Sequence, residues 1–163
     1  MKKNENYESL TRTFSRLSKF SHLSAIAGWD MFAMMPPGGS TARGEALAEL
    51  GVLQHQILTD KRVGEWLHNA LSEDLNDVEQ ANLREMTRHY QQAALLPESL
   101  VEAKSLAGSK CEHAWRSQRP ANDWAGFSAN LQEAVKLSRQ EAHIRAEGTG
   151  CSPSAAPPDI FDA

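Results

Sequence analysis

Residues 7–39 read YESLTRTFSRLSKFSHLSAIAGWDMFAMMPPGG, and this stretch decides the fold class. Its apolar side chains recur at spacings of three and four, at Tyr7, Leu10, Phe14, Leu17, Phe20, Leu23 and Ile26. That period is typical of one long amphipathic helix. The helix cannot continue past Met35, because Pro36 and Pro37 lack amide donors and the two following glycines free the backbone. The chain is therefore expected to turn at this point.

The same period returns five more times along the chain. The second expected helix is capped by Ser40 or Thr41 and ends at Thr59–Asp60, and the third contains Val63–Leu71. The fourth is capped by Asn76 or Asp77 and ends at Leu96–Pro97, and the fifth has Pro97 in its first turn. The sixth is capped by Asn122 or Asp123 and ends before Gly148. Apolar residues such as Leu71, Trp115 and Trp124 are expected to face a core.

These segments predict an all-α fold of about six amphipathic helices in an antiparallel bundle-like array, because no alternating strand pattern occurs. Residues 1–147 are expected to form the helical region. Residues 148–163 contain several Gly and Pro and no helical period, which indicates an irregular tail, interpreted as a truncated end.

Composition excludes several functional classes. The 163 residues are enough for one domain, and a net charge of −4 with a pI near 5.9 argues against a nucleic-acid binder. The longest weakly charged stretch, 22–35, is too short to cross a membrane. No signal peptide precedes the first helix, and Cys111 and Cys151 are expected to be free thiols, so a cytoplasmic location is predicted.

Metal-binding patterns are weak in this chain. Its six histidines, none of which has another four residues away, are at positions 22, 55, 68, 89, 113 and 143, and the zinc motif H-E-x-x-H is absent. The densest group of possible ligands is Cys111-Glu112-His113. Residues two apart on a helix point about 200° apart, so Cys111 and His113 are not expected to share one ion.

Other candidate groups have a structural interpretation that outweighs the catalytic one. Glu85 and His89 are one helical turn apart but favour a solvated surface pair. The acidic residues at 5, 8, 45 and 49 favour solvated faces, and Met31, Met34 and Met35 favour packing. Gly28-Trp29-Asp30 favours a close helix crossing with Asp30 accepting hydrogen bonds. No residue is assigned a catalytic, cofactor-binding or metal-binding role.

Several strings resemble one known family. The string at 28–39, GWDMFAMMPPGG, with Ala42-Arg43 after it, resembles the N-terminal signature of the carboxypeptidase Taq family of thermostable metallocarboxypeptidases. Further strings agree in order and spacing, at Leu58-Thr59-Asp60, Leu96-Pro97-Glu98, Glu112-His113-Ala114-Trp115-Arg116, Asn122-Asp123-Trp124 and Leu137-Ser138-Arg139, so that the resemblance covers residues 5 to about 150.

The resemblance implies the N-terminal part of a larger all-helical metallopeptidase, usually dimeric, that removes C-terminal residues from peptides with zinc or another divalent ion. It implies that the H-E-x-x-H motif and the substrate binders lie in the later two-thirds of a full-length member, so none transfers to this chain. The helices present correspond to those that flank and cover the substrate groove.

Two functional hypotheses follow. The first is an N-terminal fragment of a metallocarboxypeptidase that is inactive alone and binds peptide substrates only as part of the full-length enzyme. The alternative is a free-standing helical module that binds a partner through an amphipathic face. In either case a chain with uncovered apolar stripes is expected to self-associate, with homodimerisation possible, and no nucleic-acid or membrane partner is expected.

Overall fold

The computed structural model describes residues 4–149, except for the side chains of Pro37 and Thr149. Its elements in chain order are α1 (Glu5–Ala33), the short 3-10 helix η1 (Pro37–Gly39), α2 (Ser40–Thr59), α3 (Lys61–Ala70), α4 (Asp77–Ala94), α5 (Glu98–Gln118) and α6 (Trp124–Thr149). The all-α prediction is confirmed, because every regular element among the described residues is helical.

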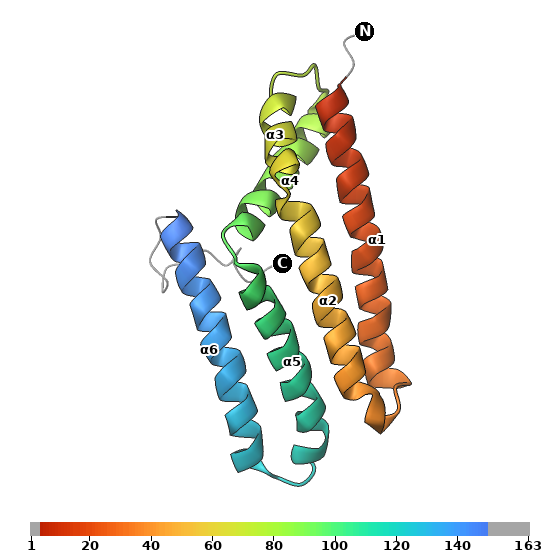
Figure 1. Ribbon diagram of the computed structural model, residues 1–163, viewed down its shortest axis with the longest axis vertical. Helices are drawn as coiled ribbons and strands as arrows, with labels where there is room; N and C mark the ends of the chain where they lie inside the picture. Colours follow the sequence, from red (N-terminus) through yellow and green to blue (C-terminus); the bar gives the residue numbers. More distant parts are fainter. Residues whose placement is uncertain (1–3, 150–163) are drawn as a thin grey trace.

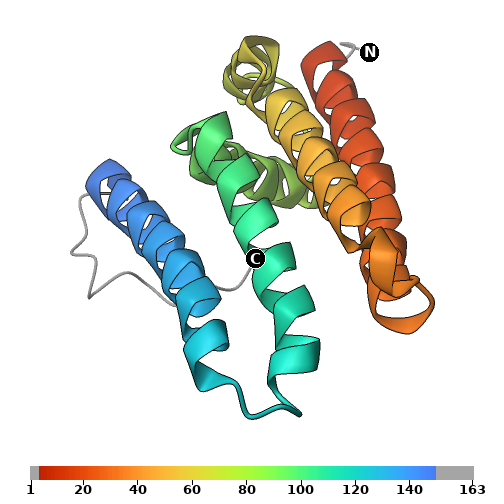
Figure 2. The ribbon, with the colours of Figure 1, turned by 60° about the horizontal axis from the view of Figure 1, so that its bottom comes forward.

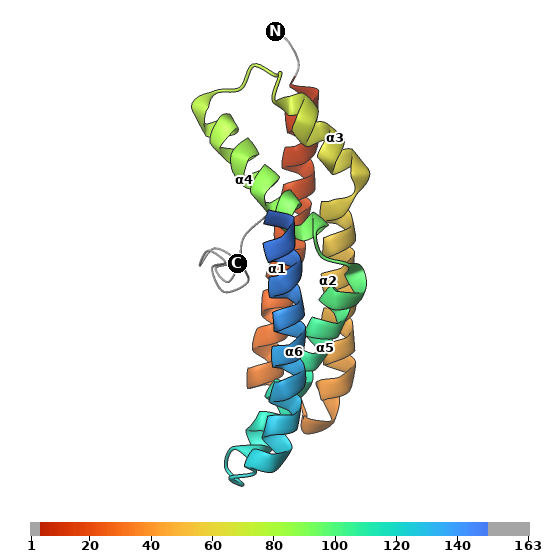
Figure 3. The same ribbon diagram turned by 90° about the vertical axis from the view of Figure 1, so that its left-hand side faces the viewer.

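Four long helices lie side by side in the order α1, α2, α5 and α6, with neighbours running in opposite directions (Figure 1). The shorter α3 and α4 pack at the end where α1 begins (Figure 3). The turn from α1 to α2 and the turn from α5 to α6 both lie at the opposite end of the molecule, apart from each other (Figure 2). We call this second end the double-turn end.

The main core lies where α1, α3 and α4 converge. Leu10 and Ala70 are fully buried there, and the core cluster consists of Tyr7, Leu10, Val63, Leu67, Ala70, Leu75 and Leu83. Burying a Leu or Val side chain contributes about 1.5–3 kcal/mol, so this cluster is the main source of packing stability. At the double-turn end Met31 is buried, with 6% of its surface exposed.

A carboxylate in the connection between α3 and α4 holds the start of α1. Glu73 accepts hydrogen bonds from the backbone N–H groups of Asn6 and Tyr7, at 2.9 and 3.0 Å, and from the side-chain amide of Asn6. The first amides of a helix have no partner within the helix, and a negative charge is favourable at that end. Glu73 therefore caps a helix that begins 68 residues earlier in the chain.

The caps agree with the sequence predictions in part. Asn76 caps α4 in a complete capping box with Glu79, and Asp123 accepts the Gly126 N–H at the start of α6. The prediction of Ser40 or Thr41 as a cap is wrong. Ser40 is already helical, because η1 continues directly into α2 and leaves Gly39 as the N-cap without a side-chain bond.

Two helix boundaries also differ from the predictions. Pro97 is the N-cap of α5, with extended backbone, rather than a residue of its first turn. Helix α6 continues through Gly148 to Thr149, so the expected tail begins at least two residues later; residues 150–163 lie outside the described part of the chain. Gly148 is tolerated there because glycine costs a helix only about 1 kcal/mol relative to alanine.

Several side chains expected to face the core are exposed instead. Leu71 is 72% exposed, Trp124 is 68% exposed and Trp115 is 47% exposed. Trp124 begins α6, which packs against α5 alone among the described helices, whereas Leu71 and Trp115 lie at or near the ends of α3 and α5, where no other described element covers them. An apolar stripe predicts burial only where a second element covers it.

Candidate functional site

The segment Gly28–Phe32 at the double-turn end is the part of the sequence that most suggested a special role. Asp30 forms an ion pair with Arg43 of α2 at 2.6 Å, and both side chains are about 30% exposed. Arg43 also donates a hydrogen bond to the Ala27 carbonyl oxygen at 3.3 Å. One arginine therefore fixes the last turns of α1 against the start of α2.

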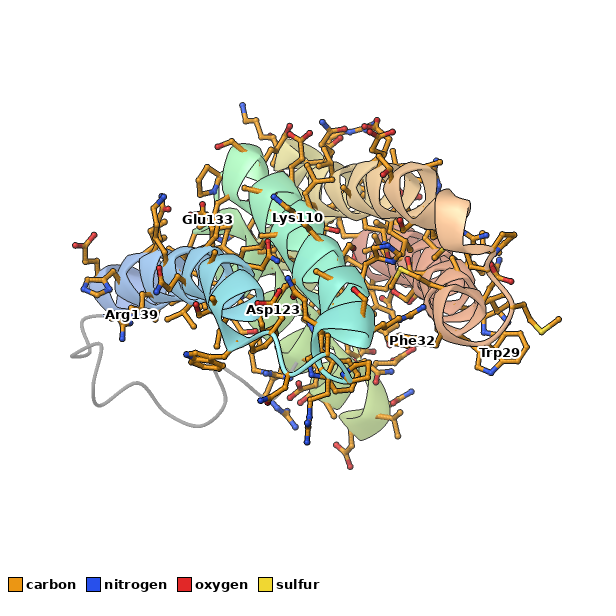
Figure 4. All side chains as sticks on the ribbon, turned by 90° about the horizontal axis from the view of Figure 1, so that it is seen from below. Trp29, Phe32, Lys110, Asp123, Glu133 and Arg139 are labelled. Carbon is orange, nitrogen blue, oxygen red and sulfur yellow. The ribbon has the colours of Figure 1, made fainter. Side chains whose placement is uncertain are left out.

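A second arginine approaches the same segment from α5. Arg116 donates a hydrogen bond to the Met31 carbonyl oxygen at 2.7 Å, and its guanidinium carbon lies 4.7 Å from the centre of the Phe32 ring. An arginine over an aromatic face at that distance is a favourable cation–π contact. Figure 4 shows Phe32 on the side of α1 toward α5, whereas Trp29 points away from the other helices. We call Asp30, Arg43, Met31, Phe32 and Arg116 the arginine clamp.

The contacts of the arginine clamp hold helices together and are not those of a catalytic site. The Asp30 carboxylate is neutralised by Arg43, and the Arg116 guanidinium contacts a main-chain oxygen and a ring, so neither presents a free acid–base group to a cavity. Asp30 is engaged by Arg43, in line with the sequence interpretation, but the predicted close helix crossing at Gly28 is wrong. Gly28 itself has no atom within 4 Å of an added Cβ, so the close approach is made by the arginines and not at the glycine.

The sequence did not identify the two arginines as partners of this segment. Arg43 and Arg116 lie within strings that resemble the family, but nothing local indicates that Arg116 reaches a carbonyl 85 residues away. Glu73 and Glu141 were missed for the same reason. Contacts between distant positions leave no periodic trace in a single sequence.

Glu141 of α6 is the most strongly engaged carboxylate between α5 and α6. It pairs with Lys104 of α5 and, at 2.8 Å, with Arg145 one turn along its own helix. Burial raises the pKa of Glu141, but the hydrogen bonds and charges of Lys104 and Arg145 outweigh burial and keep the pKa below its ordinary value. The cluster fixes α6 to α5.

The histidines and acids weighed from sequence are dispersed. His22, His68, His89 and His143 are exposed, and Glu85 accepts a hydrogen bond from Arg88 at 2.9 Å. The acidic residues at 5, 8, 45 and 49 are exposed on α1 and α2. Among the methionines, Met31 is buried as the packing interpretation predicts, but Met34 is 70% exposed.

The donor side chains do not fit a metal centre. In residues 4–149 no three His, Cys, Asp or Glu side chains come together in a way that could hold an ion. Cys111 is a free, half-buried thiol on the same helix as His113, whose Nδ1 is buried without a hydrogen-bond partner. A catalytic zinc site needs three protein ligands and an open position. Cys151 lies outside the described residues.

The hollow nearest to these groups lies between α2 and α5. It has a volume of about 470 Å³ and its polar lining is Ser40, Thr41, Glu45, Ser109, Lys110 and His113. Nucleophilic catalysis needs a hydroxyl or thiol hydrogen-bonded to an oriented base. Among the described residues His113 is the histidine that lines this hollow, and its Nδ1 has no hydrogen-bond partner.

The sequence model of the family described as carboxypeptidase Taq (M32) metallopeptidase matches residues 9–156. The chain belongs to this family. The fold that the resemblance implied, the N-terminal helices of a larger all-α metallopeptidase, is thereby confirmed.

Two curated relatives are named thermostable carboxypeptidase 1. The protein from Thermus thermophilus is 32% identical over 143 residues, and the one from Pyrococcus furiosus is 26% identical over 140 residues. Each match covers 85% of this chain but 28% of the relative. This chain thus spans about 28% of the length of these M32 relatives and corresponds to their N-terminal portion.

Solved structures of the family agree. Trypanosoma cruzi metallocarboxypeptidase 1 superposes with a TM-score of 0.76 at 38% identity, covering 97% of this chain and 32% of that protein. The Pyrococcus furiosus carboxypeptidase superposes with a TM-score of 0.68 at 25% identity, covering 87% and 29%. This M32 chain therefore has the helical arrangement of the matching third of its relatives.

Proposed function

We propose that this chain supplies the N-terminal helical scaffold of an M32 metallocarboxypeptidase, and that hydrolysis of C-terminal residues from peptides requires the rest of a full-length enzyme. The observation that carries the proposal is the combination of family membership with coverage of 28% of the Thermus relative. Zinc or another divalent ion belongs to the full-length enzyme in this proposal, and peptides are its substrates.

The positions of the possible metal ligands in this chain support the same proposal. Metal-assisted peptide hydrolysis needs a fixed set of ligands and a general base beside the ion. No group of three suitable donors occurs among residues 4–149, and the carboxylates with shifted pKa values are engaged in structural ties. The role of this chain's own residues is to hold helices in position, through Arg43, Arg116 and Glu73.

Zinc binding and peptidase assays of the purified chain test the proposal. We expect residues 1–163 to bind less than one equivalent of zinc after dialysis and to release no amino acid from the C-terminus of a peptide. The Thermus thermophilus relative, assayed in parallel, is the positive control. Stoichiometric zinc together with release of C-terminal residues, in preparations free of host peptidases, would contradict the proposal.

The second candidate function is a free-standing interaction module, and one observation favours it. The exposed side chains include Leu23, Ile26, Trp29 and Phe32, all on the second half of α1 and each at least 50% exposed. Contiguous exposed apolar surface marks interfaces. The two candidates separate by sequencing the coding DNA beyond Ala163: an H-E-x-x-H motif there favours the enzyme scaffold, and its absence favours the module.

The cytoplasmic location is likewise a proposal, supported by the two cysteines, which are too few for a disulfide framework. No helix in the described part of the chain has the length and apolar character needed to span a bilayer. Fractionation of cells that express the tagged chain tests the location, and recovery in a secreted fraction would contradict it.

A further inference from the structure

The outward face of α1 changes from charged and polar to apolar along its length. Residues 8, 12, 15, 19, 22, 26, 29 and 33 follow the helical spacing of three and four, lie on one face and are all exposed. The first part of this stripe carries Glu8, Arg12, Ser15 and Lys19, whereas the last part carries Ile26, Trp29 and Ala33. A helix face that contacts only solvent does not require apolar residues in its second half.

The apolar part widens on both sides. Leu23, Ile26, Trp29 and Phe32 are three residues apart, so each lies about 60° further round the helix than the one before it. Together they cover about half of the circumference. The opposite half faces α2, where Ser24 contacts Gln54 and Met31 is buried.

Other exposed aromatic rings lie at the same end. In the described part of the chain the exposed aromatic residues are Trp29 and Phe32 near the end of α1, Trp115 near the end of α5 and Trp124 at the start of α6. All of these helix ends lie at the double-turn end (Figure 2). An aromatic side chain has roughly 150–250 Å² to bury, and aromatic rings are enriched in the buried centre of interfaces.

We propose that the second half of α1 at the double-turn end, with Leu23, Ile26, Trp29 and Phe32 as its contacts, is the surface on which the remaining two-thirds of an M32 fold packs. This rests on the proposed function and names the partner. The size of the partner comes from the curated relatives, of which this chain covers only 28%.

A second copy of the chain is the competing occupant, but the share of the curated relatives that this chain covers, 28%, favours the rest of the fold. The exposed apolar side chains span about half the circumference of α1, more than the stripe of roughly 100° typical of a helix packed on one side. Covering them needs a body with several elements around the helix. The charged first half of the outer face, from Glu8 to Lys19, stays in water in this arrangement.

Hydroxyl-radical footprinting on two proteins tests the inference. One is the chain of 163 residues at low concentration, and the other is a single full-length chimera in which residues 1–149 replace the matching segment of the Thermus thermophilus relative. We expect modification of Trp29 and Phe32 to fall at least about fivefold in the chimera, because rings now 63% and 58% exposed become interior. The controls are Leu71 and Val78, exposed at the opposite end of the molecule, which should change less than about twofold.

A matched pair of substitutions gives an independent readout. We expect Ile26→Lys to lower the thermal midpoint of the chimera but not that of the chain alone, whereas Leu71→Lys should affect neither. An equal effect of both substitutions, or none of Ile26→Lys, would overturn the inference.

The outcomes separate the inference from the proposed function. An active chimera with Trp29 and Phe32 unprotected refutes the packing surface and leaves the function intact. An inactive chimera with both rings protected refutes the proposed function and leaves the packing surface intact. A chimera that is inactive and has both rings unprotected refutes the function and the packing surface. Protection that appears in the chain alone as its concentration rises assigns the surface to a second copy and also overturns the inference.

Discussion

Replacing Glu73 by Gln should destabilise the protein through the start of α1. The carboxylate accepts three hydrogen bonds, two from the N–H groups of Asn6 and Tyr7 and one from the Asn6 amide, at 2.8 to 3.0 Å. Gln keeps the shape but removes the charge and replaces one acceptor oxygen with a donor. Hydrogen bonds to a charged group are each worth about 1.5–3 kcal/mol, and the half-buried position of Glu73 places the net loss near the lower bound, at about 1.5–2 kcal/mol.

Thermal unfolding followed by circular dichroism measures this loss. For a domain of this size we expect the midpoint to fall by about 3–8 °C. The matched control is Glu85→Gln, because Glu85 is exposed on α4 and pairs only along its own helix with Arg88, which limits its contribution to about 0.5 kcal/mol. Equal midpoint changes for the two variants would refute the capping role of Glu73.

The same contact predicts a pH dependence. Burial raises the pKa of Glu73, but the hydrogen bonds from Tyr7 and Asn6 outweigh burial, so its pKa lies below the ordinary value of 4.5. A carboxyl group with a lowered native pKa stabilises the fold above its unfolded pKa, and this stability is lost as the pH falls through the native value. The stability difference between the wild type and Glu73→Gln should therefore be constant above pH 4.5 and shrink below it. A difference that grows on acidification would show that the charge is not what holds α1.

Two further predictions concern packing. Leu10→Ala should lower the free energy of unfolding by about 2–5 kcal/mol in urea unfolding, because Leu10 is fully buried. Leu71→Ala, at a 72% exposed position, should change it by less than about 0.5 kcal/mol. Similar losses for both variants would contradict the position of the core. Gly64→Ala should destabilise by about 1–3 kcal/mol, because the new Cβ would lie 2.6 Å from the Tyr90 hydroxyl oxygen. Gly51→Ala, which meets no atom within 4 Å, should instead stabilise by up to about 1 kcal/mol, and a loss there as large as at Gly64 would show that helix glycines are equivalent.

The arginine clamp at the double-turn end bears on the proposed function. Arg43 and Arg116 fix α1 to α2 and α5, so the exposed rings of Trp29 and Phe32 are held in a defined arrangement instead of on a loose helix end. A fixed apolar surface can pack against a partner at low entropic cost. The clamp is therefore consistent with a scaffold role for this part of an M32 enzyme.

Local sequence signals determined the helices and their breaks. The period of three and four, the helix breaks at prolines 36, 37 and 97 and the polar cap at Asn76 act within a few residues, so they could be read directly. They were confirmed, except that Pro97 precedes α5 and does not lie in its first turn. The strings around Gly28 and Glu112 likewise indicated the M32 family, because family signatures are continuous in the chain.

The tertiary structure alone decided which apolar faces are covered and which polar groups pair. Trp115 and Trp124 follow the same helical period as buried residues, yet they are exposed because no described element lies over them. Arg116 meets the Met31 carbonyl, and Glu73 the start of α1, across 85 and 66 or more residues. Periodicity shows which side of a helix is apolar, but only the path of the whole chain determines what lies against it.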